Sequence, residues 1–483
     1  MLFTSFQYAL FLPVVVLLFW TLPKRLRLPM LLLASYFFYM CWMPIFILLI
    51  VPMTVFNWVY GRLLYKAQQR RRLLFGVGIA VNLLVLGVFK YANFFLDSLS
   101  AIWRMSSGHG LDWSVSIILP LGISFFAFEY IHYLFEIYRG NKPVDSFVLF
   151  ALYAAFFPTQ IAGPIKRYPD FVKQMLDDRP LRLSYFDEGV PLIIIGLGKK
   201  LLLADTLSVF VQMGYSSATA YGAVELWLFA FAFAFQIYFD FSGYTDIARG
   251  SAMLFGYKIP INFNMPYIAA NISEFWHRWH ISLSSWLRDY LFIPLGGSRG
   301  TRLQTNRNLL VTMALGGLWH GASWNFMVWG VFHGLLLIIH REFVSFKQRF
   351  APVAVLVDSP AGKGVSQILT FLAVCVGWVF FRVTDIKLAS AVVKKMVTMH
   401  PLFMPQEAHQ IVILNSYLPL VVPAAIVMIG VLLLANKPLS ELNERGTLRR
   451  LNPILKGAFC TLVVALIVVF SSGADQPFIY FRF

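Results

Sequence analysis

Long apolar runs alternate with short polar segments along almost the whole chain. A run of about 20 apolar residues is long enough to cross a bilayer as an α-helix. We therefore predict an all-α, polytopic membrane protein with about 10–12 transmembrane helices, forming a single integral-membrane domain over residues 1–483. The run at 30–61 is broken by proline into two helices, and the runs at 309–319 and 326–340 are short for two crossings. The other expected spans are residues 6–22, 73–95, 117–138, 147–165, 190–213, 224–247, 368–381, 411–435 and 458–470.

Residues 248–307 depart from this pattern, because no apolar run there reaches the length of a spanning helix. Tryptophan, histidine, arginine, asparagine and serine are instead interleaved with leucine and isoleucine. Irregular polar backbone is tolerated at membrane depth only where protein or a water-filled cavity surrounds it. We expect re-entrant or amphipathic helices at the cytoplasmic side here, with a catalytic segment over residues 248–340. Residues 382–410 are long enough for an ordered external loop.

Basic residues in the short loops predict the orientation of the chain. The first apolar run is followed directly by Lys24, Arg25 and Arg27, and further basic clusters occur at 62–72 and 445–456. Cytoplasmic loops carry an excess of Lys and Arg. We therefore expect an extracytoplasmic N-terminus and C-terminus. No basic residue precedes the first run, so we expect it to stay as a helix rather than to be removed as a signal peptide.

The composition excludes a soluble globular protein. Apolar residues make up 59% of the 483 residues and charged residues only 13%, about half of their usual share in soluble domains. The 40 basic and 23 acidic residues give a net charge of +17. Cytoplasmic loops facing anionic lipid account for most of this excess, and a polyanionic substrate such as a coenzyme is a second use for it. Three scattered cysteines indicate neither a disulfide framework nor structural zinc.

Two histidines are candidates for proton transfer. His320 ends an apolar run within Gly-Gly-Leu-Trp-His-Gly, where the glycines leave room for a substrate, and His280 lies in Trp-His-Arg-Trp-His-Ile-Ser. Neutral imidazole suits proton transfer near pH 7, so we favour a general base with a helper. One alternative is a structural histidine. Another is a metal site if His277 and His280 share a helical face, but no third ligand accompanies them, so we predict no bound metal.

A polar cluster lies near the end of one expected span, where Asp240, Ser242, Tyr244 and Asp246 follow one another closely. Such a cluster forms either a polar brace or the wall of a pocket. No Gly-x-Ser-x-Gly elbow surrounds Ser242, so the sequence gives little support to a serine hydrolase.

A second polar cluster places Glu129, His132 and Glu136 on one helical face. One Glu-x-x-His alone does not make a di-iron site, which also needs glutamates from two other helices. We therefore predict a packed polar seam at this position.

Several motifs along the chain occur together in one known family. They are the His280 and His320 motifs, Gly163-Pro164, Tyr-Phe-Asp-Phe-Ser-Gly-Tyr at 238–244, Ile-Ser-Glu-Phe-Trp at 272–276, Ser-Ser-Trp-Leu-Arg-Asp-Tyr at 284–290, Leu-Gly-Gly-Ser-Arg-Gly at 295–300 and Pro-Phe-Ile-Tyr-Phe-Arg-Phe at 477–483. Together they resemble the membrane-bound O-acyltransferase (MBOAT) family. Within it the chain is similar to the bacterial branch of alginate O-acetyltransferase membrane subunits, which is related to the teichoic acid D-alanyl transferases.

The resemblance implies a fold with a central tunnel, in which His320 is the catalytic histidine and His280 the second active-site histidine. Candidate residues for substrate binding or the tunnel wall are Trp276, Arg278, Trp279, Ser284, Arg288, Trp319, Asp240, Ser242 and Tyr244. Basic groups such as Arg278, Arg288 and Arg299 are candidates for holding coenzyme phosphates. The resemblance further suggests that Tyr480, in an extracytoplasmic aromatic tail at 473–483, is an acyl relay; an interfacial aromatic anchor is the alternative.

The function implied by the resemblance is membrane O-acetylation. The chain would take acetyl from cytoplasmic acetyl-CoA, a substrate rather than a bound cofactor, and pass it across the bacterial cytoplasmic (inner) membrane to an alginate-like polysaccharide. An extracytoplasmic acetyltransferase of a polysaccharide biosynthesis complex is the expected partner, besides the lipid bilayer, and nucleic acid is not expected. The alternative is a polytopic transporter or flippase for a lipid-linked sugar, with the histidines as a proton relay.

Overall fold

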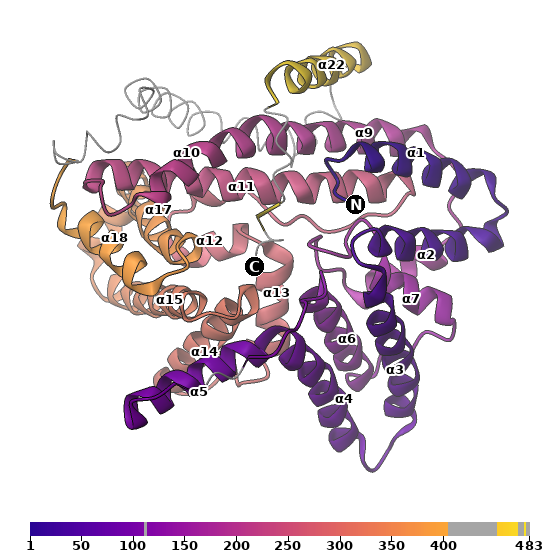
Figure 1. The fold of residues 1–483 in the computed structure, drawn as a ribbon, viewed down its shortest axis with the longest axis horizontal. Helices are drawn as coiled ribbons and strands as arrows, with labels where there is room; N and C mark the ends of the chain where they lie inside the picture. Colours follow the sequence, from indigo (N-terminus) through magenta and orange to yellow (C-terminus); the bar gives the residue numbers. More distant parts are fainter. Residues whose placement is uncertain (111–113, 404–451, 472–477, 480–483) are drawn as a thin grey trace. The chain divides into compact units, whose positions relative to one another are not determined.

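The computed structural model describes residues 1–110, 114–403, 452–471 and 478–479. All regular secondary structure in these residues is helical, which confirms the predicted all-α class (Figure 1). The chain forms two compact units. Unit 1 holds residues 1–193 and 244–260, and unit 2 holds residues 194–243 and the described residues from 261 onward. The prediction of a single functional domain over residues 1–483 stays a prediction.

Unit 1 is a bundle of helices. Its elements are α1 (Phe6–Thr21), α2 (Lys24–Met40), η1 (Pro44–Phe46), α3 (Ile47–Lys66), α4 (Arg71–Leu86), η2 (Gly87–Tyr91), α5 (Ala92–Ser107), α6 (Ile123–Tyr138), α7 (Phe147–Ala155), α8 (Tyr168–Leu176) and the first part of α9 (Leu183–Gly198). Helix α6 packs against α3, α4, α7 and α8, and nearly all of its side chains are buried. Because it is buried on nearly all sides, α6 forms the core of this unit.

Unit 2 holds the longer helices and the predicted catalytic segment. Its elements are η3 (Lys199–Ala204), α10 (Asp205–Ser216), most of α11 (Ala223–Leu254), η4 (Pro266–Ile268), α12 (Ile272–Arg278), α13 (Ile281–Leu287), η5 (Arg288–Phe292), α14 (Arg302–His320), α15 (Trp324–Arg349), α16 (Ala351–Asp358), α17 (Pro360–Arg382), α18 (Ile386–Thr398) and α22 (Pro453–Phe470). Helix α15 packs against α12, α14 and α17, and aromatic side chains of α11 pack against α10 and α17.

The chain is a multi-pass membrane protein. Six helices within the described residues are long and apolar enough to cross a bilayer: Pro44–Lys66, Arg71–Ser107, Ala223–Leu254, Trp324–Arg349, Pro360–Arg382 and Pro453–Phe470. Helix α1 is apolar but has 16 residues, shorter than the roughly 20 of a typical span. The expected span 411–435 lies outside the described residues. The predicted count of 10–12 crossings therefore stays a prediction.

Three expected spans differ in the structure. Residues 147–165 form a helix only as far as Ala155, because Pro158 and Pro164 interrupt the backbone hydrogen bonds that a continued helix needs. Residues 117–122 are not helical, and α6 begins at Ile123. The expected span 326–340 was too short, since α15 continues through its basic residues to Arg349 and reaches 26 residues.

The predicted polar seam of α6 is confirmed as a buried network. Lys166 Nζ lies 2.6 Å from Glu129 Oε1 and 2.6 Å from Thr159 Oγ1, and the Tyr168 amide donates to His132 Nε2. Glu136 accepts from Arg139 and Asn141 near the helix end. A paired charge of this kind fixes helix α6 against the segment after α7.

Replacing Lys166 with methionine is expected to destabilise the protein by about 3–5 kcal/mol, because the Glu129 carboxylate would stay buried without its cation. The thermal midpoint of the detergent-solubilised protein measures this change. The double variant Lys166→Met with Glu129→Leu removes both charges and should recover most of the loss. A single variant as stable as the parent would contradict the argument.

Candidate active site

The α14–α15 hairpin determines the position of His320. Helix α14 begins with a capping box, in which the Thr301 hydroxyl and the Gln304 side chain each accept from the other residue's backbone amide. It ends at His320, and Gly321 follows in an extended conformation. The two helices approach closely at Gly317, where a Cβ would lie 2.1 Å from the Phe326 carbonyl oxygen. His320 is therefore held at the closed end of a tightly packed helix pair.

His280 occupies the bend between α12 and α13. Its φ of 42° is in the left-handed region, which is uncommon for a residue other than glycine. Asn262 supports the bend, since its carbonyl oxygen accepts from the Ile281 amide and its Oδ1 from the Ser282 amide. The shared helical face that a metal site at His277 and His280 would require is not present, because α12 ends at Arg278.

The structure brings the two histidines together in a buried aromatic cluster. Their ring centroids are 6.5 Å apart, and His280 is 0% and His320 5% exposed. Trp319 packs against both rings, at 6.0 Å from His280 and 5.0 Å from His320. Burial lowers the pKa of His280 below its ordinary value, because the imidazolium form would lose its hydration. Its neutral ring can accept a hydrogen bond or a proton.

A cavity of about 580 Å³ opens beside α13, α14 and α15, within the usual range for small-molecule sites. We call it the basic cavity, because its charged and titratable lining residues are His277, Arg288, His340 and Arg341. Its polar lining also includes Ser273, Ser284, Ser285, Ser298, Thr305 and Thr312, beside the indole of Trp276. The basic residues suit a polyanion, and the hydroxyl groups and the indole suit an apolar or weakly polar chain attached to it.

A second cavity, of about 590 Å³, lies at the other end of the α14–α15 hairpin. We call it the Arg382 cavity. Its lining residues are Ser208, Val209, Gln212, Gln236, Ser323, Asn325, Phe326, Phe380, Phe381, Arg382, Val383, Thr384 and Ile479. It is polar but contains a single charged residue among these.

Aromatic side chains separate His320 from each cavity. Phe381 and Phe326 line the Arg382 cavity and pack at 5.2 and 6.5 Å from the His320 ring. Trp329 lies 5.0 Å from His320 and 5.7 Å from Trp276, which lines the basic cavity. Aromatic side chains therefore connect the His320 ring to the lining of both cavities.

Three of the residues predicted from the sequence line the basic cavity, namely Trp276, Ser284 and Arg288. Trp319 lies between the histidines. Trp279 is instead buried against Phe263, Phe275 and Trp378. Arg278 forms an ion pair with Glu274, and neither Arg278 nor Arg299 is among the lining residues of either cavity.

The Asp240 cluster is divided between the two units. Asp240 forms a buried ion pair with Lys200 in unit 2, and Ser242 is buried on the next turn of α11. Tyr244 stacks on Phe3 in unit 1, with ring centroids 4.7 Å apart. Asp246 pairs with Arg249 in unit 1. Tyr480 lies outside the described residues.

Several residues of this region were not found from the sequence. His340 and Arg341 line the basic cavity, but they follow an apolar run and were interpreted as its boundary. His333 is fully buried and packs 4.8 Å from Trp329; its position between Phe332 and Gly334, which resembles the setting of His320, was the available signal. Lys200 pairs with Asp240 across 40 residues, a contact that no local pattern indicates.

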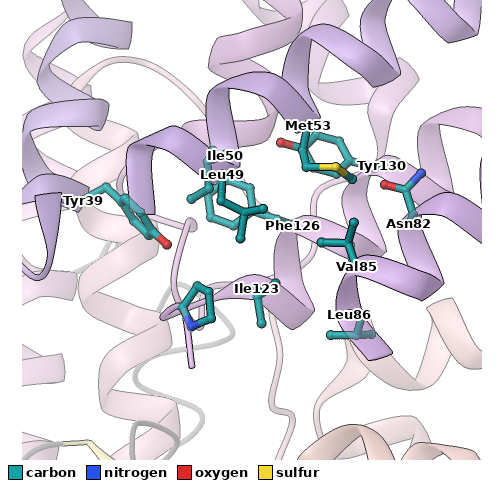
Figure 2. Close-up of a pocket in the computed structure, with 12 residues that line it drawn as sticks. Tyr39, Leu49, Ile50, Met53, Asn82, Val85, Leu86, Ile123, Phe126 and Tyr130 are labelled. Carbon is teal, nitrogen blue, oxygen red and sulfur yellow. The ribbon is translucent and has the colours of Figure 1, made fainter. Parts of the chain in front are cut away.

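Unit 1 contains a cavity of only about 20 Å³ (Figure 2). Figure 2 shows Met53, Ile50, Val85 and Phe126 around it, with the Asn82 amide at one side. One water needs about 10–15 Å³ on this measure. This cavity is too small for a substrate. The two histidines and the two cavities near them lie in unit 2.

The described part of the chain shows no set of side chains that could bind a metal ion. No group of three or more His, Cys, Asp or Glu side chains lies close enough together there to hold a metal ion.

Sequence comparison assigns the family. A model of the MBOAT, membrane-bound O-acyltransferase family matches residues 99–381, which include both histidines and most of the lining of both cavities. The chain belongs to the membrane-bound O-acyltransferase family. It is accordingly an O-acyltransferase, as the MBOAT resemblance predicted, and the alternative of a transporter is not carried further.

Individual MBOAT relatives agree with this assignment. The chain is 43% identical over 387 residues to a probable alginate O-acetylase AlgI of Azotobacter vinelandii, covering 79% of this chain and 74% of the relative. It is 37% identical to a peptidoglycan O-acetyltransferase of Helicobacter pylori, covering 76% and 73%. A teichoic acid D-alanyltransferase of Bacillus subtilis is 29% identical, covering 55% and 69%.

Proposed function

We propose that this protein takes acetyl groups from cytoplasmic acetyl-CoA and passes them across the bacterial inner membrane for O-acetylation of an extracytoplasmic polysaccharide. The observation that carries the proposal is the buried His280–His320 pair, against which Phe326 and Phe381 of the Arg382 cavity pack, and which Trp329 links to Trp276 of the basic cavity. Relatives that are an alginate O-acetylase and a peptidoglycan O-acetyltransferase support acetyl as the group and a polysaccharide as its destination.

In the proposed reaction His320 acts as the general base. It takes the proton of an acceptor hydroxyl while the hydroxyl oxygen attacks the thioester carbonyl carbon, so that a C–O bond forms. Collapse of the tetrahedral intermediate breaks the C–S bond, and the proton passes to the leaving thiolate, which gives an acetyl ester and free coenzyme. Such proton transfer contributes about 10²–10⁴-fold to rates. His280, neutral because it is buried, orients the site.

The basic cavity is the proposed site of the acyl donor. A coenzyme carries several phosphate charges, and Arg288 and Arg341 are the permanent cations of this lining. The same end of the α14–α15 hairpin carries Arg302, Arg307 and Lys347. An excess of basic residues marks the cytoplasmic side of a membrane protein, where acetyl-CoA is found. The donor would enter from there, and the Arg382 cavity would face the acceptor.

Replacing Arg288 or Arg341 with alanine is expected to raise the KM for acetyl-CoA about tenfold with little change in kcat, since each variant removes one charge-assisted contact from substrate and transition state alike. Initial rates over a range of acetyl-CoA concentrations measure this split. Arg349→Ala removes an exposed arginine farther along α15 and should leave KM unchanged. If the KM for acetyl-CoA of the Arg288 and Arg341 variants equals that of the Arg349→Ala control and of the parent, the donor does not bind in the basic cavity.

Tyr480 is the proposed acyl relay on the outer side, on the basis of the family resemblance of the tail. Tyr480→Phe removes only the hydroxyl and should lower transfer at least tenfold and abolish any acetylated protein species. Tyr65→Phe, an exposed tyrosine of α3, is the matched control. Full activity of Tyr480→Phe would refute the relay and leave the aromatic tail as an anchor.

The donor half of the proposal is tested with purified protein in detergent. Acetyl-CoA is added together with a membrane-free extract that supplies the partner and polymer, and released coenzyme is measured as free thiol against a blank without acetyl-CoA. We expect saturable binding of acetyl-CoA and coenzyme release that depends on His320. A folded protein that neither binds acetyl-CoA nor releases coenzyme would overturn the proposal.

A further inference from the structure

Three charged side chains form a buried cluster in unit 2. Lys200 Nζ lies 2.6 Å from Asp205 Oδ1 and 2.7 Å from Asp240 Oδ1. All three residues are at most 4% exposed. Lys200 belongs to η3, Asp205 is the first residue of α10, and Asp240 belongs to α11. The cluster holds one cation and two carboxylates, so it has acceptor capacity beyond what Lys200 alone can satisfy.

The end of the chain supplies a further donor to this cluster. The backbone amide of Ile479 donates to Asp240 Oδ2 at 2.7 Å, across 239 residues of sequence. The Lys200 ammonium lies 4.9 Å from the centre of the Phe478 ring, within range of a cation–π interaction. Phe478 is 1% and Ile479 7% exposed. Both described residues of the C-terminal segment therefore contact the same ion pair.

This attachment places the segment beside the catalytic site. Ile479 lines the Arg382 cavity together with Phe381 and Phe326, the two rings that pack against His320. A hydrogen bond to an ionised acceptor is about twice as strong as a neutral one, and it is stronger still in a buried setting. Asp240 contributes through its charge and its orientation, since it is not itself among the residues that line either cavity.

We propose that Asp240, oriented by Lys200, is a positioning residue that docks the C-terminal segment of the chain at the wall of the Arg382 cavity. The polar cluster on α11 thus acts as a receptor for a main-chain amide and an aromatic ring of the tail. Only the effect of docking on turnover rests on the proposed function, because docking itself is a contact within the chain.

The test measures how accessible residue 479 is. Ile479→Cys keeps the backbone amide that Asp240 binds, in a background where Cys41, Cys375 and Cys460 are replaced by alanine. The rate of labelling by a water-soluble maleimide is then compared with and without Asp240→Asn. The asparagine has one oxygen, which can accept from Lys200 or from residue 479 but cannot keep both bonds in the present geometry. We expect labelling to become at least tenfold faster.

A matched control removes a different carboxylate of the same helix. Asp246 is buried and pairs with Arg249 at 3.2 Å, so Asp246→Asn perturbs α11 to a similar degree without touching the Lys200 cluster. Labelling of residue 479 should keep its original rate in this variant. Equal acceleration in both variants would show a general loosening of α11 and overturn the proposal.

Phe478→Ala tests the same docking without altering the buried charges, in case Asp240→Asn fails to fold. It removes the ring beside Lys200 and should also speed labelling of residue 479. A folded Phe478→Ala protein that labels at the original rate would overturn the proposal. None of these rates depends on acetyl transfer, so failure of the proposed function and failure of the docking are separate outcomes.

Discussion

Replacing His320 with alanine is expected to lower acetyl transfer by about three orders of magnitude, within the range for loss of a general base. The protein should still fold, because the imidazole packs in an aromatic cage in which Trp319, Trp329 and Phe381 contact one another or the helices around them. Truncating it leaves a small cavity rather than an unpaired charge. The measurement is the initial rate of coenzyme release at saturating acetyl-CoA, beside the amount of monodisperse protein.

His109→Ala is the control for this prediction, because His109 is an exposed histidine whose Nδ1 lies 3.1 Å from the Ser107 carbonyl oxygen at the end of α5. It should retain the full rate. A His320→Ala protein that is folded and transfers acetyl groups within tenfold of the parent would exclude His320 as the base. His280 would then be the remaining imidazole of the pair.

The second large effect is expected on folding. The substitution Gly317→Leu should prevent stable packing of the α14–α15 hairpin. A Cβ at this position alone would lie 2.1 Å from the Phe326 carbonyl oxygen and 3.1 Å from the Gly330 Cα. Backbone atoms cannot rotate away as a flexible side chain does, so the helices must separate. Overpacking of this kind typically costs about 1–3 kcal/mol per site and more where backbone has to move. Size-exclusion chromatography in detergent should show loss of the folded protein.

Gly364→Leu is the matched substitution in helix α17, where a Cβ would meet nothing within 4 Å. Leucine is a better helix former than glycine by about 0.8 kcal/mol or more, so this variant should be at least as stable as the parent. If Gly317→Leu and Gly364→Leu behave alike, close contact at Gly317 does not hold the hairpin together.

The alternation of apolar runs and basic loops predicted the helical class and most helix positions. It failed at 147–165, where the run is mostly apolar but proline ends the helix at Ala155. Apolar composition reports where a segment is buried, and it does not distinguish a spanning helix from a short helix followed by buried turns. It also failed at the end of α15, where the expected span stopped at charged residues although the helix continues to Arg349.

The site was partly predictable for a different reason. His320 and His280 carry recognisable motifs, and the structure places their rings 6.5 Å apart. No single-sequence pattern shows that the bend at His280 meets the end of α14, or that Asn262 bonds to the backbone of this bend. Asp240 could be identified as a buried carboxylate, but its partners Lys200 and Ile479 are 40 and 239 residues away. Pairings over such distances are decided by the fold rather than by local sequence.

The central claim is transfer of acetyl from one membrane face to the other through the histidine site. Radiolabelled acetyl-CoA added to the outside of inside-out vesicles, with acceptor polymer and partner protein sealed in the lumen, tests it most directly. We predict label in the luminal polymer for the parent and none for His320→Ala, with all free coenzyme outside. Equal luminal label in both forms, or none in either although both are folded and the lumen is intact, would contradict the account.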